Sequence, residues 1–188
     1  MKHFYQNIEG FMSERNTMLL DLVIKDIRPN STWVELGSWT GKSVAYCVVN
    51  LINKNKLGKF YAVDTWDGGI ELQNDVTTKN LKDIFYNNVS PILDKIEVVQ
   101  SLSWDAAKLF QDETVDFCYV DAGHTYDCVS KDLEAWWPKI KSGSYFGGDD
   151  YTKGHPGVQN AVWDFFGPKN IKVRRSGRCW FVKKPMLS

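Results

Sequence analysis

Features that would place this 188-residue chain in a specialised class of protein are largely missing. The four cysteines show no CxxC spacing, which argues against a zinc site and against a disulfide framework. Lysine and arginine together number 23, as do aspartate and glutamate, so no net charge would attract nucleic acid or an anionic membrane. No apolar run approaches the length of about 18 residues that a transmembrane helix needs, and the first residues form no apolar signal core. We therefore expect a soluble, cytoplasmic protein that acts on neither nucleic acids nor membranes.

The chain does contain a regular alternation of short apolar strands and helical segments, without repeats or linkers. Strands are predicted at residues 32–36, 60–63, 96–100, 115–120 and 144–148. Helices are predicted at residues 11–27, 42–52, 80–88, 103–110, 126–137 and 156–166. Two last strands, around residues 171–173 and 179–182, are close enough to form an antiparallel hairpin.

This order predicts an α/β fold with a Rossmann-like, seven-stranded and mostly parallel sheet, helices on both faces and a C-terminal antiparallel hairpin. Residues 1–188 form a single domain, with an N-terminal helical segment (1–30), a ligand-binding core (31–167) and a closing hairpin (168–188). Residues 169–188 carry seven Lys or Arg and no acid, which we interpret as solvent-facing groups of the terminal strands. Because ligands of open sheets bind beyond the carboxyl ends of the strands, the residues at those ends are the candidates for a site.

A glycine-containing loop follows the first predicted strand, with the sequence Glu35-Leu36-Gly37-Ser38-Trp39-Thr40-Gly41-Lys42-Ser43. Gly37 and Gly41 permit a tight turn and a close approach of backbone to a ligand at a helix N-terminus. The spacing fits neither the G-x-G-x-x-G dinucleotide fingerprint nor the phosphate-binding P-loop. With Glu35 just before it, the loop suits a cationic ligand better than a pyrophosphate.

Polar groups also follow the second and third strands. Asp64 ends the second strand, and its two carboxylate oxygens could accept both hydroxyls of a ribose; a turn-forming role is the alternative. Trp66 could stack on a purine or wall a pocket. Ser101 and Ser103 end the third strand, where they could contact an adenine or, in the case of Ser103, cap a helix.

Three carboxyl groups, Asp121, Asp149 and Asp150, are predicted at the ends of the adjacent fourth and fifth strands. These three carboxylates would repel one another unless they are protonated, hydrogen-bonded or bridged by a cation. Oxygen ligands of this kind suit Mg²⁺. His124 lies three residues beyond Asp121 and is the natural general base for a hydroxyl bound there. His155 could line the same site or anchor a loop.

These strand ends resemble those of the class-I S-adenosylmethionine-dependent methyltransferases, and most of all the small subgroup called methyltransferase family 24. The resemblance spans roughly residues 31–167. Its matching segments are Trp33-Val34-Glu35-Leu36-Gly37-Ser38, Thr40-Gly41-Lys42-Ser43, Tyr61-Ala62-Val63-Asp64-Thr65-Trp66, Val120-Asp121-Ala122-Gly123-His124-Thr125-Tyr126, Gly148-Asp149-Asp150-Tyr151 and His155-Pro156-Gly157-Val158. The Asp-x-x-His segment and the Asp-Asp pair also resemble those of metal-dependent sugar O-methyltransferases.

The resemblance implies one methyltransferase domain that binds S-adenosylmethionine and transfers its methyl group to a hydroxyl. The implied cofactor-binding residues are Glu35, Gly37, Ser38, Trp39, Gly41, Ser43, Asp64, Thr65, Trp66, Ser101, Ser103 and Asp121. The implied Mg²⁺ ligands are Asp121, Asp149 and Asp150, and His124 is the implied base. Glu35 is expected to contact the ammonium or the ribose and to stay away from the sulfur, because neutralising the sulfonium would stabilise the ground state more than the transition state.

The acceptor implied by this chemistry is a small molecule, either a sugar or another hydroxylated metabolite. Its contacts are expected from residues 67–79, from the N-terminal segment and from residues 151–156. So short a chain could borrow part of its lid from a neighbouring subunit, which would make it a homo-oligomer. Two alternatives stay open: a non-catalytic S-adenosylmethionine-binding module and a nucleotide-dependent Rossmann-fold enzyme.

Overall fold

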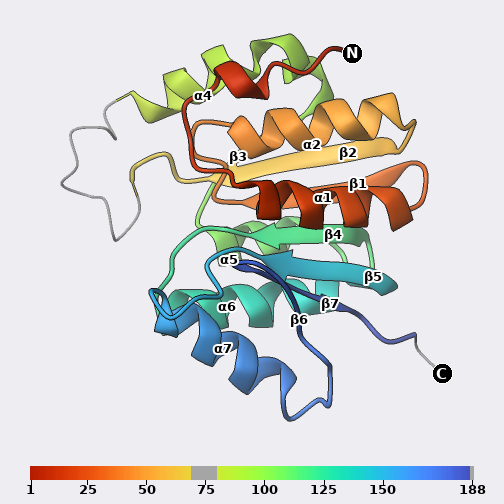
Figure 1. Cartoon of the computed structure of the whole chain (residues 1–188), viewed down its shortest axis with the longest axis vertical. Coiled ribbons are helices and arrows are strands. Elements are labelled where there is room, and N and C mark those ends of the chain that lie inside the picture. Colours follow the sequence, from red (N-terminus) through yellow and green to blue (C-terminus); the bar gives the residue numbers. More distant parts are fainter. Residues whose placement is uncertain (69–79, 187–188) are drawn as a thin grey trace.

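The strands form one sheet in the order β3-β2-β1-β4-β5-β7-β6 in the computed structural model, which describes residues 1–68 and 80–186 (Figure 1). The strands are β1 (Ser31–Leu36), β2 (Leu57–Asp64), β3 (Glu97–Gln100), β4 (Val115–Val120), β5 (Ile140–Gly148), β6 (Arg174–Ser176) and β7 (Cys179–Lys183). The first five run parallel, and β7 runs antiparallel to both β5 and β6. The predicted Rossmann-like sheet with its C-terminal antiparallel hairpin is confirmed.

Helices cover both faces of this sheet. They are α1 (Glu14–Asp26), α2 (Lys42–Asn53), α4 (Leu81–Val89), α5 (Ser103–Ala106), α6 (Tyr126–Trp136) and α7 (Pro156–Phe166), with short 3₁₀ turns η1 (Tyr5–Asn7), η3 (Ser90–Lys95), η4 (Ala107–Leu109) and η5 (Trp137–Lys139). Local signals start several of them: Ser13 and Asn16 form a capping box at α1, and the Thr125 hydroxyl accepts the Cys128 N–H at α6. None of the helices in the described ranges is both long enough and apolar enough to cross a membrane.

Alternating side chains on the strands build two apolar cores. Trp33 of β1 points into the core shared with α1, α2 and α4, whereas its neighbour Val34 points into the core shared with α5, α6 and α7. Both side chains are fully buried. Figure 1 shows the first set of helices on one side of the sheet and α6 and α7 on the other. Burial on both faces is what makes these strands continuously apolar.

Several predicted boundaries are wrong. The first hairpin strand lies at Arg174–Ser176, a few residues later than predicted, because its register with β7 is set by a turn at Gly177 (φ +63°). Strand β5 begins at Ile140, earlier than predicted. The helix predicted from Ser103 to Phe110 is split into α5 and η4. Leu102, not Ser103, occupies its N-cap position, so the capping role considered for Ser103 is wrong.

The strand order reverses between β1 and β4, and there the loops at their carboxyl ends touch. The Asp121 N–H donates to Leu36 O at 2.9 Å. A Cβ atom placed on Gly37 would lie 1.9 Å from Asp121 O, so only glycine allows the two backbones to come this close. A reversal of this kind is where open α/β sheets bind their ligands.

Candidate active site

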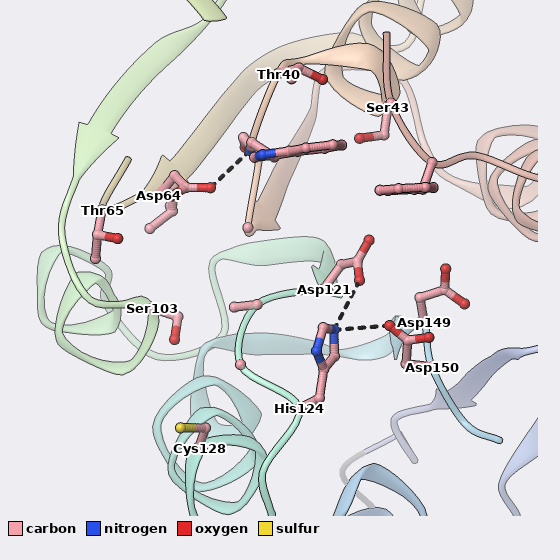
Figure 2. A pocket seen from close by; sticks show the side chains of 18 of the residues that line it. Thr40, Ser43, Asp64, Thr65, Ser103, Asp121, His124, Cys128, Asp149 and Asp150 are labelled. Atoms are coloured by element: carbon pink, nitrogen blue, oxygen red, sulfur yellow. Dashed lines mark hydrogen bonds and ion pairs between the residues drawn. The ribbon is translucent and has the colours of Figure 1, made fainter. Parts of the chain in front are cut away.

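A cavity of about 850 Å³ opens beyond these strand ends, a volume within the usual range for small-molecule sites. Twelve of the predicted site residues line it: Gly37, Ser38, Trp39, Ser43, Asp64, Thr65, Ser101, Ser103, Asp121, His124, Asp149 and Asp150. Figure 2 shows side chains from the separate strand ends facing one another across this space. The predicted convergence on one crevice is therefore present, with residues 10–13 and Asn16 of the N-terminal segment added to its wall.

The glycine loop forms one wall, and its two glycines do different things. Gly37 has φ +85°, and its N–H donates to Val63 O at 2.8 Å, which ties the loop to β2. Gly41 also has φ +85°, but a Cβ there would lie 2.6 Å from a Val89 methyl group and 3.1 Å from the Phe85 ring. Gly41 does not line the cavity, so its predicted ligand contact is corrected to a packing contact with α4 and its end.

Asp64 holds this loop from the end of β2. Its carboxylate accepts the Trp39 N–H at 2.8 Å and the Trp66 N–H at 2.7 Å. Burial raises the pKa of the Asp64 carboxyl, and these backbone donors oppose that shift. Asp64 therefore has the turn-forming role. Because a carboxylate offers about four lone-pair sites, Asp64 can still accept hydrogen bonds from the two hydroxyls of a ribose.

Trp66 lies away from the cavity. Its indole N–H donates to Trp39 O at 3.0 Å, and its ring packs 4.8 Å from the Phe85 ring in the apolar core. The predicted stacking of Trp66 on a purine is wrong in this structure, since a core contact occupies the ring. Trp104, just beyond β3, lines the cavity instead.

Glu35 is also absent from the cavity surface, because it lies beneath the glycine loop with only 2% of its surface exposed. Burial raises the pKa of its carboxyl to about 8, Ser43 opposes the shift, and the negative charges of Asp121 and Asp64 add to it. Glu35 Oε2 and Ser38 Oγ have no hydrogen-bond partner within the described part of the chain. Two orphaned buried polar atoms beside a glycine loop fit a cationic, hydrogen-bonding ligand, such as the methionine end of S-adenosylmethionine.

The opposite wall carries the Asp-Asp pair, in which every carboxylate oxygen has a contact. Asp149 Oδ2 accepts from Asn16 Nδ2 at 2.6 Å, and its Oδ1 lies 3.2 Å from Arg178 Nε. Asp150 Oδ2 lies 2.9 Å from His124 Nε2, and its Oδ1 pairs with Arg178 Nη2. Figure 2 shows the His124 ring between Asp121 and Asp150, and the Asp121 oxygen is 3.9 Å from His124 Nε2.

A divalent ion suits this wall by its charge and donor chemistry, although the three predicted carboxyl groups are not gathered around one point. Three carboxyl groups and one guanidinium lie at this wall, and burial raises the pKa of Asp121, with the charge of Asp149 adding to the shift. Within the described residues, the side chains with ligand atoms inside 4.8 Å of one another are His124, Asp150 and His155. The predicted trio is not gathered to this degree, because Arg178 and Asn16 hold Asp149.

Asn16 and Arg178 are the site residues that the sequence analysis missed. Asn16 is 4% exposed and reaches the site from α1, where its local sequence indicates only the partner of Ser13 in a capping box. Arg178 reaches it from the β6–β7 turn, within a basic segment whose charges we interpreted as solvent-facing. Neither contact has a local sequence signal, since each joins segments more than 25 residues apart.

The order of strands, the glycine loop after β1 and the acid after β2 define a class-I methyltransferase fold. The sequence profile of the family Methyltransf_24, described as a methyltransferase domain, matches residues 34–151. The chain belongs to this family and is an S-adenosylmethionine-dependent methyltransferase.

Solved structures share the fold at low sequence identity. The O-methyltransferase NovP has a TM-score of 0.75 and 15% identity, covering 91% of this chain and 80% of NovP. CalS11, a TDP-rhamnose 3′-O-methyltransferase of calicheamicin biosynthesis, has a TM-score of 0.62 and 16% identity, covering 91% of this chain and 81% of CalS11. An O-methyltransferase from Thermotoga maritima has a TM-score of 0.67 and 12% identity, covering 97% of this chain and 69% of that one. No curated protein matches the sequence.

Proposed function

We propose that this methyltransferase transfers the methyl group to a hydroxyl oxygen of a small acceptor, with His124 as general base. The observation that carries the proposal is the position of the His124 ring. Its Nε2 lies 2.9 Å from Asp150 Oδ2 inside the cavity that the glycine loop also lines. A base held there can take a proton from an acceptor placed between the two walls.

In the proposed reaction, His124 removes the acceptor proton while the acceptor oxygen attacks the methyl carbon of S-adenosylmethionine, which is a substrate here. A carbon–oxygen bond forms, the carbon–sulfur bond breaks, and S-adenosylhomocysteine leaves. Asp64 binds the ribose, and the loop at Gly37 and Ser38 holds the methionine end. With a pKa of about 8, Glu35 is mostly neutral at pH 7 in the ligand-free protein, so it does not over-stabilise the sulfonium.

Carboxylates set the charge of the acceptor side. Asp150 orients the His124 ring and favours the protonated imidazole that forms during transfer. Once the Arg178 side chain has moved away from Asp149 and Asp150, these two carboxylates together with Asp121 would hold a divalent ion such as Mg²⁺, which when bound lowers the pKa of an acceptor hydroxyl. The acceptor class, a sugar or another hydroxylated metabolite, agrees with the carboxylate-lined wall and with the activity of CalS11, a TDP-rhamnose 3′-O-methyltransferase. Residues 69–79, part of the segment expected to contact the acceptor, lie outside the described residues.

His124→Gln tests the base. We expect kcat to fall about 10²–10⁴-fold while the Kd of S-adenosylmethionine is unchanged, because the imidazole acts on the acceptor. The matched control is His155→Gln, whose ring lies 4.7 Å from that of His124 and should cost less than about tenfold in kcat. Cofactor binding without turnover of any hydroxylated acceptor would favour the binding-module alternative. A loss of turnover in EDTA that Mg²⁺ reverses supports the metal, and full turnover in EDTA contradicts it.

A further inference from the structure

We propose that the Arg178 guanidinium and a divalent metal ion compete for Asp149 and Asp150. In the ligand-free protein Arg178 neutralises these carboxylates, and it leaves them when a metal ion binds. This inference rests on the metal-binding part of the proposed function. It concerns the ligand-free protein and assigns a role to the β6–β7 turn, which carries Arg178 into the cavity wall.

Every oxygen of the Asp-Asp pair already has a partner, and Arg178 contacts both carboxylates. Asp149 Oδ2 is held by Asn16 and its Oδ1 by Arg178 Nε at 3.2 Å. Asp150 Oδ2 is held by His124, and its Oδ1 by Arg178 Nη2, with His155 Nε2 at 3.6 Å. Each oxygen keeps a further lone pair, but a cation that bridged the two carboxylates would lie beside the guanidinium that already bridges them.

Of the groups that contact the Asp-Asp pair, the Arg178 side chain is the one that can leave. Asn16 is 4% exposed on a capped helix and also donates to Tyr119 Oη at 3.0 Å, so moving it would disturb the core. The Arg178 side chain is 44% exposed and has a solvent route. It is also positively charged, and two cations at one carboxylate pair repel each other.

The Arg178 side chain can move without unfolding the β6–β7 hairpin. Its backbone carbonyl accepts the Tyr151 N–H at 2.7 Å, a contact independent of the side chain. Arg175 of the same hairpin donates to Tyr151 O at 3.1 Å and lies over the Tyr151 ring, so it also ties the turn to the loop after β5. A new rotamer of Arg178 therefore frees the carboxylates and leaves the turn in place.

The test is a titration of the cofactor-free protein with Mn²⁺, in which electron paramagnetic resonance counts the free ion. We expect Arg178→Ala to bind Mn²⁺ about tenfold or more tightly than the wild type, because the competing charge is gone. Arg178→Lys should bind with intermediate affinity, since an ammonium keeps the charge but cannot bridge two carboxylates as a planar guanidinium does. The matched control, Arg175→Ala, should stay within about twofold of the wild type, because in residues 1–68 and 80–186 the Arg175 guanidinium donates to the Tyr151 and Gly177 carbonyls and to no carboxylate.

A further variant localises the effect: adding Asp149→Asn to Arg178→Ala should remove the gain in affinity. Unchanged or weaker Mn²⁺ binding in both Arg178 variants, or no Mn²⁺ binding in any protein, overturns the proposal. If Arg178→Ala does not fold, the order of Arg178→Lys and wild type decides the question alone. Because the titration needs neither acceptor nor turnover, a failure of the O-methylation proposal in the His124 experiment is recorded separately.

Discussion

Replacing Glu35 by Gln should stabilise the ligand-free protein at neutral pH, in the opposite direction from most substitutions of buried polar groups. Burial raises the pKa of Glu35 from its ordinary value of 4.5 to about 8. The folded state therefore keeps a proton that the unfolded chain releases, and stability falls as pH rises from 4.5 to about 8. Across this pH interval the free energy of unfolding falls by about 5 kcal/mol at most, and at pH 7 it has fallen by about 3 kcal/mol. Gln keeps a neutral group of similar size and avoids the loss.

The assay is urea unfolding of both proteins at pH 5, 6, 7 and 8 without cofactor. The difference in unfolding free energy should be small at pH 5 and grow by roughly 1 kcal/mol per pH unit. Exposed Glu134→Gln on α6 is the control, and its profile should run parallel to that of the wild type. A difference between Glu35→Gln and wild type that is constant from pH 5 to 8 would refute the reasoning, because it would mean that Glu35 titrates alike in both states.

Two further substitutions test the walls of the cavity. Gly37→Ala should destabilise the fold by about 1–3 kcal/mol through its left-handed backbone alone, and further through the clash with Asp121 O; a lower urea midpoint measures it, and an unchanged midpoint contradicts the tight contact of the two loops. Asp64→Asn should raise the Kd of S-adenosylmethionine about tenfold or more in calorimetry, because a charge-assisted bond to the ribose becomes a neutral one. Equal affinity of both proteins would leave Asp64 with only its backbone contacts to Trp39 and Trp66.

The sequence was sufficient where the information is local. Short apolar runs that stop at an aspartate predict where a buried strand ends, so Asp64 and Asp121 could be placed at the ends of their strands and expected at one crevice. The predicted helix starts at residues 126 and 156 are also confirmed, and in the structure the Thr125 hydroxyl caps α6 and Pro156 begins α7. The seven-stranded, mostly parallel sheet followed from the alternation of predicted strands and helices together with the closing hairpin.

The sequence was insufficient where a side chain has two possible neighbours. Gly41 and Trp66 belong to motifs at the cavity edge, but each packs on Phe85, and no local pattern distinguishes a core contact from a ligand contact. Asn16 and Arg178 reach the carboxylates from the two ends of the chain, so only the assembled fold brings them there. The sequence therefore predicts the three carboxyl groups of the site but not Arg178 and Asn16, which contact them.

The seam between Gly37 and Asp121 also constrains how this enzyme could acquire new acceptors. There is no room for even one methyl group between Gly37 and Asp121. The loop after β1 and the loop after β4 therefore cannot vary independently of each other. The cavity is also bounded by residues 10–13 and by the β6–β7 turn, where we expect substitutions to be tolerated better. Directed evolution for a different hydroxyl substrate should therefore accumulate changes in these two segments more readily than at Gly37 and Asp121.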